Sequence, residues 1–159
     1  MSSKHLTLVS GPFRTMFQND SFREGQQLKA EGRATIRLPE DNADAMVILL
    51  NVIHHRYENV PREPLSISLL YQLGLLIDKY GMGKVISLLA ESWTTELGSY
   101  FTANDSKTRA QLLCVDYTFD LPVLFHEATK TVMFHAQEEI MANCVPKGLL
   151  GTFQPQYSS

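Results

Sequence analysis

Cysteine is scarce in this chain, which contains two among 159 residues. Cys114 and Cys144 lie in no Cys-x-x-Cys motif, and they form no disulfide framework. Small secreted domains depend on several disulfides, whereas unpaired thiols are typical of reducing compartments. No signal peptide is visible, since the apolar stretch at the N-terminus is too short and too interrupted for one. The sequence therefore predicts an intracellular protein, in the cytoplasm or the nucleus, with two reduced thiols.

Long hydrophobic runs are also missing. The longest apolar stretches, MVILLNVI and LLYQLGLLI, fall well short of the ~20 residues that a membrane-spanning helix requires. Charge of one sign is not concentrated anywhere: the 14 lysines and arginines are scattered from Lys4 to Lys147, and the formal net charge is −3. A nucleic-acid surface and a polybasic membrane patch both need clustered basic residues. We therefore expect neither nucleic acid nor membrane as a partner.

Motifs of catalysis and of metal binding are absent as well. GMGKV, residues 81–85, has part of the pattern of a phosphate-binding loop. Such a loop needs a glycine upstream of its lysine, but the two positions where it could stand hold Asp78 and Lys79. It also needs Ser or Thr directly after the lysine, where this chain has Val85. His54 and His55 are adjacent, so on a helix their rings diverge by about 100° and do not share one ion. No Gly-x-Ser-x-Gly elbow occurs. We predict that the chain is not an enzyme and that it has no cofactor and no metal.

Apolar residues at helical spacing are the strongest positive signal. At the N-terminus, Leu6, Val9, Phe13 and Phe17 recur at steps of three and four, and Gly11-Pro12 marks the start of a second helix. The segment QNDSFREGQQ has no periodicity and predicts turns. Five further helices are expected, at about residues 43–57, 66–80, 85–97, 109–119 and 120–140.

Helix boundaries and core positions can also be assigned from the sequence. Asp41 or Asn42 is expected to cap the helix at 43–57, Gly81 to end the helix at 66–80, and Asp120 to cap the last helix. Trp93 lies in the middle of an apolar stripe formed by Val85, Leu88, Leu89, Trp93 and Leu97. We therefore predict that Trp93 is a core residue.

One segment has the alternation of a strand. In ATIRLP, residues 34–39, Ala34, Ile36 and Leu38 alternate with polar side chains. A single strand leaves its N–H and C=O groups without partners. The sequence therefore predicts a strand edge around Ile36 that is open to another segment or another protein.

Several stretches taken together resemble a known family. SSKHLTLVSGPFRTMF, FREG, IRLPEDNADAMVILLNVIHHRYENVPRE and ISLLYQLGLLIDKYGM are similar to a BTB/POZ domain of the filamentous-fungal type. The resemblance implies a helix-rich α+β fold. In the family a strand pair precedes the first helix, so the chain is expected to be an N-terminally truncated form that lacks its first strands.

The resemblance also implies a division of the chain. Residues 1–100 correspond to the BTB/POZ-like domain, incomplete at its N-terminus. Residues 101–150 resemble the C-terminal helical extension of fungal members, and FTANDSKT at 101–108 is the expected boundary. We predict that residues 151–159 form a disordered tail.

The family implies a role in protein–protein association, as a homodimer or with other protein partners. The residues that match its first-helix interface are Leu6, Val9 and Phe13. An intramolecular core is the other interpretation of these three residues, and the sequence leaves both open.

Two further roles for a BTB/POZ-like chain remain open. One alternative to the interaction module is an adaptor that recruits substrates to a cullin-3 ubiquitin ligase, and another is a non-functional truncated fragment. Adaptor function would depend on the surface around Arg56, Tyr57 and Glu58. A small helical enzyme or ligand-binding protein is a further alternative, and it would require a deep pocket with convergent polar groups.

Overall fold

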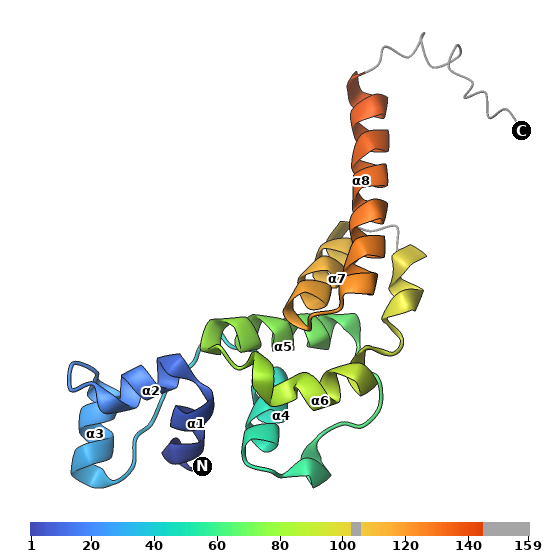
Figure 1. Ribbon diagram of the computed structural model, residues 1–159. Helices are drawn as coiled ribbons and strands as arrows, with labels where there is room; N and C mark the ends of the chain where they lie inside the picture. The colour runs from blue at the N-terminus through green and yellow to red at the C-terminus, as the bar shows by residue number, and fades with distance from the viewer. Residues whose placement is uncertain (103–105, 145–159) are drawn as a thin grey trace, which may run out of the picture.

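The computed structural model describes the backbone of residues 1–102 and 106–144 and the side chains of residues 1–100 and 107–134. Figure 1 shows short N-terminal helices at one end of the molecule, the central helices in the middle and a pair of C-terminal helices, α7 and α8, at the other end. The N-terminal helices are α1 (Ser3–Val9), α2 (Gly11–Gln18) and α3 (Arg23–Glu31). The central helices are α4 (Ala43–Ile53), the 3₁₀ turn η1 (Tyr57–Asn59), α5 (Ile67–Tyr80) and α6 (Gly83–Thr94). The C-terminal elements are the 3₁₀ helix η2 (Leu97–Thr102), α7 (Ser106–Thr118) and α8 (Pro122–Cys144).

The break between α1 and α2 falls at Gly11-Pro12, as the sequence predicts, and Ser10 secures it. The Ser10 side chain is the N-cap of α2 and accepts the backbone N–H of Phe13 at 3.2 Å. The same hydroxyl donates to the carbonyl of Tyr80, at the end of α5, at 2.8 Å. The rings of Phe13 and Tyr80 stack with their centroids 4.6 Å apart. These contacts fix the N-terminal pair of helices to the central helices.

The expectation of turns in QNDSFREGQQ is wrong from Arg23 onward, because α3 begins there. Leu28 packs partly buried against the core, but a single large apolar residue makes no periodic stripe. Gly25 is buried where α3 meets α2, and a Cβ there would lie 2.8 Å from the carbonyl oxygen of Met16. Gly32 ends the helix with φ +69°. A tertiary contact therefore stabilises a helix that the hydrophobic pattern does not reveal.

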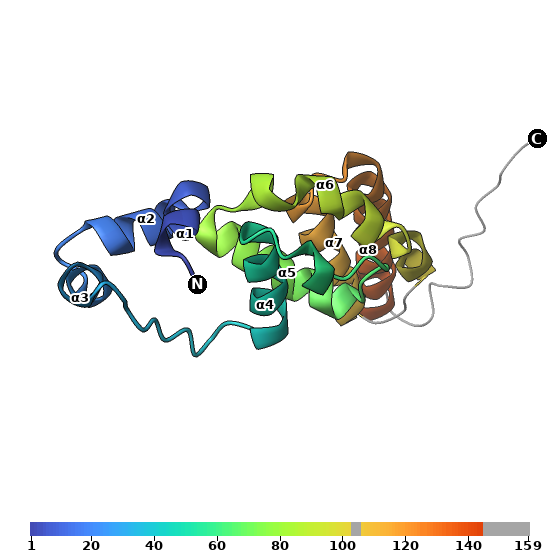
Figure 2. The ribbon, with the colours of Figure 1, turned by 90° about the horizontal axis from the view of Figure 1, so that it is seen from below.

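The strand expected at residues 34–39 is not formed, and the described parts of the chain contain no strand. Figure 2 shows this segment as an irregular connection between α3 and α4. Its burial still alternates: Ala34, Ile36 and Leu38 are half-buried, while Thr35 and Arg37 are exposed. A strand needs a neighbour to bond its backbone, and no described segment supplies one. The structure thus supports a helix-rich fold, and the α+β expectation is not confirmed.

The central helices begin and end close to the predicted positions because their caps are local. The Asn42 side chain accepts the backbone N–H of Ala45, and that of Ser66 accepts the N–H of Leu69. Gly81 ends α5 in the left-handed region with φ +63°. Helix α4 ends earlier than expected, at Ile53, because His55 has φ +57° and the chain turns into η1.

Trp93 is buried as predicted, with 1% of its surface exposed, and its Nε1–H donates to the carbonyl of Pro61 at 2.8 Å. The assignment of Leu88 to the same buried stripe is wrong, because Leu88 is 94% exposed. Leu88 lies five residues before Trp93, which rotates it away from the buried face of a helix with 3.6 residues per turn.

The C-terminal pair is a helical hairpin in which α7 packs along α5 and against α8 and η2. Pro122 opens α8 as expected, but Asp120 is not its N-cap. Asp120 instead adopts φ +55° in the turn between the two helices. Leu112, Val115, Phe119 and Ala128 of this pair belong to the same hydrophobic cluster as the central helices.

The division at residues 101–108 stays a prediction. The expected disordered tail at 151–159 lies outside the described residues.

A polar network joins the segment before α4 to the end of α5. The Asp41 side chain is 4% exposed, and it accepts Lys79 Nζ at 2.6 Å and the Tyr80 hydroxyl at 2.5 Å. Burial raises the pKa of Asp41, but these two hydrogen bonds outweigh it, and the net pKa is lowered. Burial and the bond to Asp41 raise the pKa of Tyr80 to about 12. The carboxylate is therefore the ionised partner of two donors.

Candidate functional site

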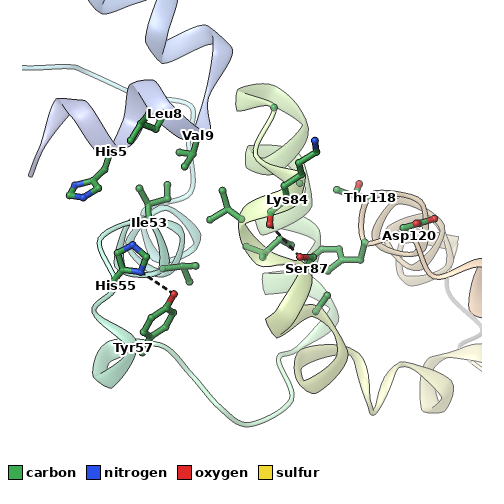
Figure 3. Close-up of a pocket in the computed structure, with 17 residues that line it drawn as sticks. His5, Leu8, Val9, Ile53, His55, Tyr57, Lys84, Ser87, Thr118 and Asp120 are labelled. Carbon is green, nitrogen blue, oxygen red and sulfur yellow. Dashed lines mark hydrogen bonds between the residues drawn. The ribbon is translucent and has the colours of Figure 1, made fainter.

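A groove of about 1170 Å³ opens where the N-terminal and central helices meet. Its lining residues come from α1, from the end of α4 and η1, from α6, and from the end of α7 (Figure 3). Its volume lies slightly above the usual range of ligand pockets, about 300–1000 Å³.

The first helix supplies one wall of the groove. Val9 is half-buried and lines the groove, and Leu8 lines it with 74% of its surface exposed. Leu6, one turn earlier, points into the protein core and is 3% exposed. Helix α1 therefore has two apolar sides, one in the core and one at the groove.

The floor of the groove is apolar. It is formed by Val52 and Ile53 at the end of α4, by Ile86 and Ala90 of α6, and by Phe119 after α7. All five of these residues are buried. These side chains are attached to helices that the core holds in place, so the floor is formed before any partner binds.

Polar groups stand at the rim. The His55 Nδ1 and the Tyr57 hydroxyl share a hydrogen bond of 3.2 Å, and the Ser87 hydroxyl donates to the carbonyl of Lys84 (Figure 3). Asp120 lies at the α7 end of the groove. An apolar floor with a polar rim is the usual construction of a protein–protein interface.

His54 attaches the start of α1 to the end of α4. The Ser2 N–H donates to His54 Nε2 at 3.1 Å, and His54 Nδ1 lies 2.9 Å from the carbonyl of Leu50. An amide N–H only donates, so Nε2 is the acceptor and Nδ1 carries the ring proton. The His5 ring packs edge-on against His54, with the centroids 5.2 Å apart. These contacts position the α1 wall of the groove.

A buried acid, Asp116, lies close in sequence to the α7 residues that line the groove. Asp116 is 1% exposed, and no hydrogen-bond partner reaches either of its carboxylate oxygens. Burial raises the pKa of Asp116 to about 6. Thr118, Phe119 and Asp120, which line the groove, follow it directly in the chain.

The structure separates the residues that the sequence proposed for an interface. Leu6 and Phe13 are 3% and 2% exposed, so their side chains belong to the intramolecular core. Val9 lines the groove, and Ile36 is half-buried against the core rather than an open edge. These positions are not brought together into one exposed surface.

Arg56, Tyr57 and Glu58 lie together in the exposed turn after α4. Of the three, only Tyr57 lines the groove.

Leu8, Ile86 and Phe119 are the main groove residues that sequence reasoning missed. Leu8 gave a usable signal, because it is apolar yet lies off the stripe formed by Leu6, Val9 and Phe13. An apolar residue away from the buried face of an amphipathic helix is either incidental or part of a second contact surface. Ile86 and Phe119 gave no such signal, since their role depends on how α6 and α7 pack.

Among the described side chains, no group of three or more His, Cys, Asp or Glu residues could hold a metal ion. The rim hydroxyls of Ser87 and Tyr57 bond to a carbonyl and to an imidazole nitrogen, respectively.

Comparisons with protein-family models, curated proteins and solved structures found no match to the chain. Within the described residues, no helix is both long enough and apolar enough to cross a membrane.

Proposed function

We propose that the chain is a protein–protein interaction module of the BTB/POZ type that self-associates through the face of the groove. The observation that supports this most directly is the position of Leu8. This leucine is 74% exposed and stands beside a preformed apolar floor. Exposed apolar surface with a polar rim is a feature of interaction sites. In the BTB/POZ family that the sequence resembles, the interface is expected on the corresponding first helix.

A protein partner fits this groove better than a small molecule does. Its floor offers apolar area, and its apolar surface continues outward onto Leu8 rather than closing over a cavity. A second copy of the chain would bury Leu8 and Val9 against α6 in a reciprocal contact, as a two-fold interface requires.

We also propose that the chain has the α+β fold of the BTB/POZ family, in which residues 34–39 are a strand. Residues 34–39 have the alternating burial of a strand without a neighbour, and we propose that they pair when a partner supplies one. Hydrogen exchange at the Ile36 and Leu38 amides tests this point. Strong protection in a demonstrated monomer would contradict it, because the amides would already be bonded. We further propose that the chain works in a reducing intracellular compartment, because its two cysteines form no disulfide framework.

Two leucines provide a matched test of the interface. Leu8→Glu places a charge at the groove, while Leu88→Glu places one at an exposed position on α6 outside the lining. We expect Leu8→Glu to weaken self-association on the order of 100-fold or more, because it would bury a charge without a partner. Leu88→Glu should leave the dissociation constant unchanged. Equal constants for the two variants, measured by analytical ultracentrifugation, would contradict the assignment of this face.

A second candidate, recruitment of a cullin-3 ligase, is favoured by the turn after α4. Arg56 and Glu58 are exposed there, and neither forms an ion pair with another residue in the part of the chain that the structure describes. If this turn binds the cullin, charge reversal in Arg56→Glu abolishes co-purification and leaves self-association intact. Co-purification that survives the reversal would exclude this turn as the contact.

A further inference from the structure

The carboxyl group of Asp116 is the least satisfied polar group in the described core. It is 1% exposed, and neither oxygen has a hydrogen-bond partner. Buried polar side chains are almost always hydrogen-bonded, and an isolated ionised carboxylate in an apolar site is strongly disfavoured. The Asp116 side chain is therefore either neutral in the packed protein or ionised in a form that opens locally and admits water.

No charged neighbour compensates Asp116. Helix α7 packs against α5, η2 and α8. Burial is the only cause that shifts the pKa of Asp116, so none of the ionisable groups on these elements contributes. The described ionisable groups on these three elements are Asp78, Lys79, Tyr71 and Tyr80 of α5, Tyr100 of η2, and His126, Glu127 and Lys130 of α8.

The position of Asp116 connects it to the groove. Its backbone carbonyl accepts the N–H of Leu121 at 2.9 Å and so closes the turn between α7 and α8. Asp120, within that turn, has φ +55°, a left-handed conformation that aspartate adopts more readily than most other residues with a Cβ. Thr118, Phe119 and Asp120 are the α7 contribution to the groove lining. A movement of the end of α7 therefore changes the groove.

We propose that Asp116 is a proton-controlled switch that sets how tightly the end of α7 closes the groove. When the carboxyl is neutral, the end of α7 stays packed. When it is ionised, water stabilises the charge only if the turn opens, so the open form becomes more populated. The regulatory meaning of this switch rests on the proposed function of the groove, whereas the switch itself is a property of the isolated chain.

The direction of the pH effect follows from linkage. In the open form the carboxyl has an ordinary pKa, and in the packed form the pKa is raised to about 6. The packed form therefore binds the proton more tightly, and raising the pH favours opening. A difference of about two pKa units corresponds to at most about a 100-fold change in the opening equilibrium.

Hydrogen exchange of the α7 amides tests the switch directly. After correction for the intrinsic exchange rate, we expect protection near the end of α7 to fall by up to about 10-fold between about pH 5 and about pH 7, because the carboxyl of the open form, with an ordinary pKa of about 4, is already ionised at pH 5. Asp116→Asn keeps the shape but cannot ionise, so its protection should not change with pH. Asp78→Asn, at an exposed acid on α5, should respond as the wild type does. Equal protection of the wild type at both pH values would overturn the proposal.

A second measurement applies if Asp116→Asn does not fold. Carbon-detected NMR follows the Asp116 carboxyl in the wild-type chain without any substitution. A titration midpoint of the carboxyl near pH 6, with parallel shifts at the Phe119 and Asp120 amides, supports the switch. A titration midpoint near pH 4, as for an exposed acid, overturns it. Both measurements use the chain alone, so their failure is distinct from a failure of self-association.

Discussion

Replacing Ser10 by alanine removes a hydroxyl group that connects the two N-terminal helices to α5. The Ser10 side chain is fully buried, with an exposed fraction of 0%. It accepts the Phe13 N–H at 3.2 Å and donates to the Tyr80 carbonyl at 2.8 Å. Alanine fits the same space but leaves one buried donor and one buried acceptor without a partner.

The size of the effect follows from these two losses. Loss of an N-cap side chain lowers helix stability by about 1 kcal/mol. A buried carbonyl that loses its partner destabilises by roughly 1–3 kcal/mol. The two effects share one atom and do not add fully, so we expect Ser10→Ala to lower the free energy of unfolding by about 2–3 kcal/mol. Domains have total stabilities of about 5–15 kcal/mol, so this is a large fraction.

Urea denaturation followed by the fluorescence of Trp93 measures this change. The slope of the unfolding free energy against urea should stay the same while the midpoint falls. Ser92→Ala is the matched control, because the exposed Ser92 hydroxyl donates to the carbonyl of Leu89 at 2.9 Å. We expect it to change stability by less than about 0.5 kcal/mol. If the two variants are equally stable, the role given to Ser10 is wrong.

Two further substitutions test other contacts. Asp41→Asn should lower the unfolding free energy by roughly 1–3 kcal/mol at neutral pH, because charged hydrogen bonds from Lys79 and Tyr80 are lost. The pKa of Asp41 is lowered in the folded state. The extra stability of the wild type over Asp41→Asn should therefore disappear as the pH falls through that folded pKa. A stability difference that persists in strong acid would show that it does not come from the ionised carboxylate. Gly25→Ala should destabilise the packing of α3 on α2, because its Cβ would lie 2.8 Å from the Met16 carbonyl oxygen. Thermal unfolding measures this effect, and an unchanged midpoint would show that the helices adjust freely.

Helix positions were predictable where the signals are local. The Asn42 and Ser66 caps and the left-handed Gly81 are chemical properties of a few adjacent residues, and they fix the start of α4 and both ends of α5. Burial of Trp93 followed from its place in an apolar stripe. Such features need no knowledge of which helices meet.

The features that escaped prediction depend on contacts between distant segments. Helix α3 needs Gly25 against α2, and the segment around Ile36 stays irregular because no described strand lies beside it. The groove is lined by residues of α1, α4, α6 and α7 together, so Ile86 and Phe119 show their role only in three dimensions. Nothing in the sequence distinguishes Asp116 from a surface acid, because its burial depends on how α7 packs in the fold.

The solution mass of the purified chain, measured by light scattering after size exclusion, tests the central claim most directly. Self-association through the groove face predicts a mass of twice 18.0 kDa for the wild type and of 18.0 kDa for Leu8→Glu. A wild-type chain that stays at 18.0 kDa across the accessible concentrations would contradict self-association.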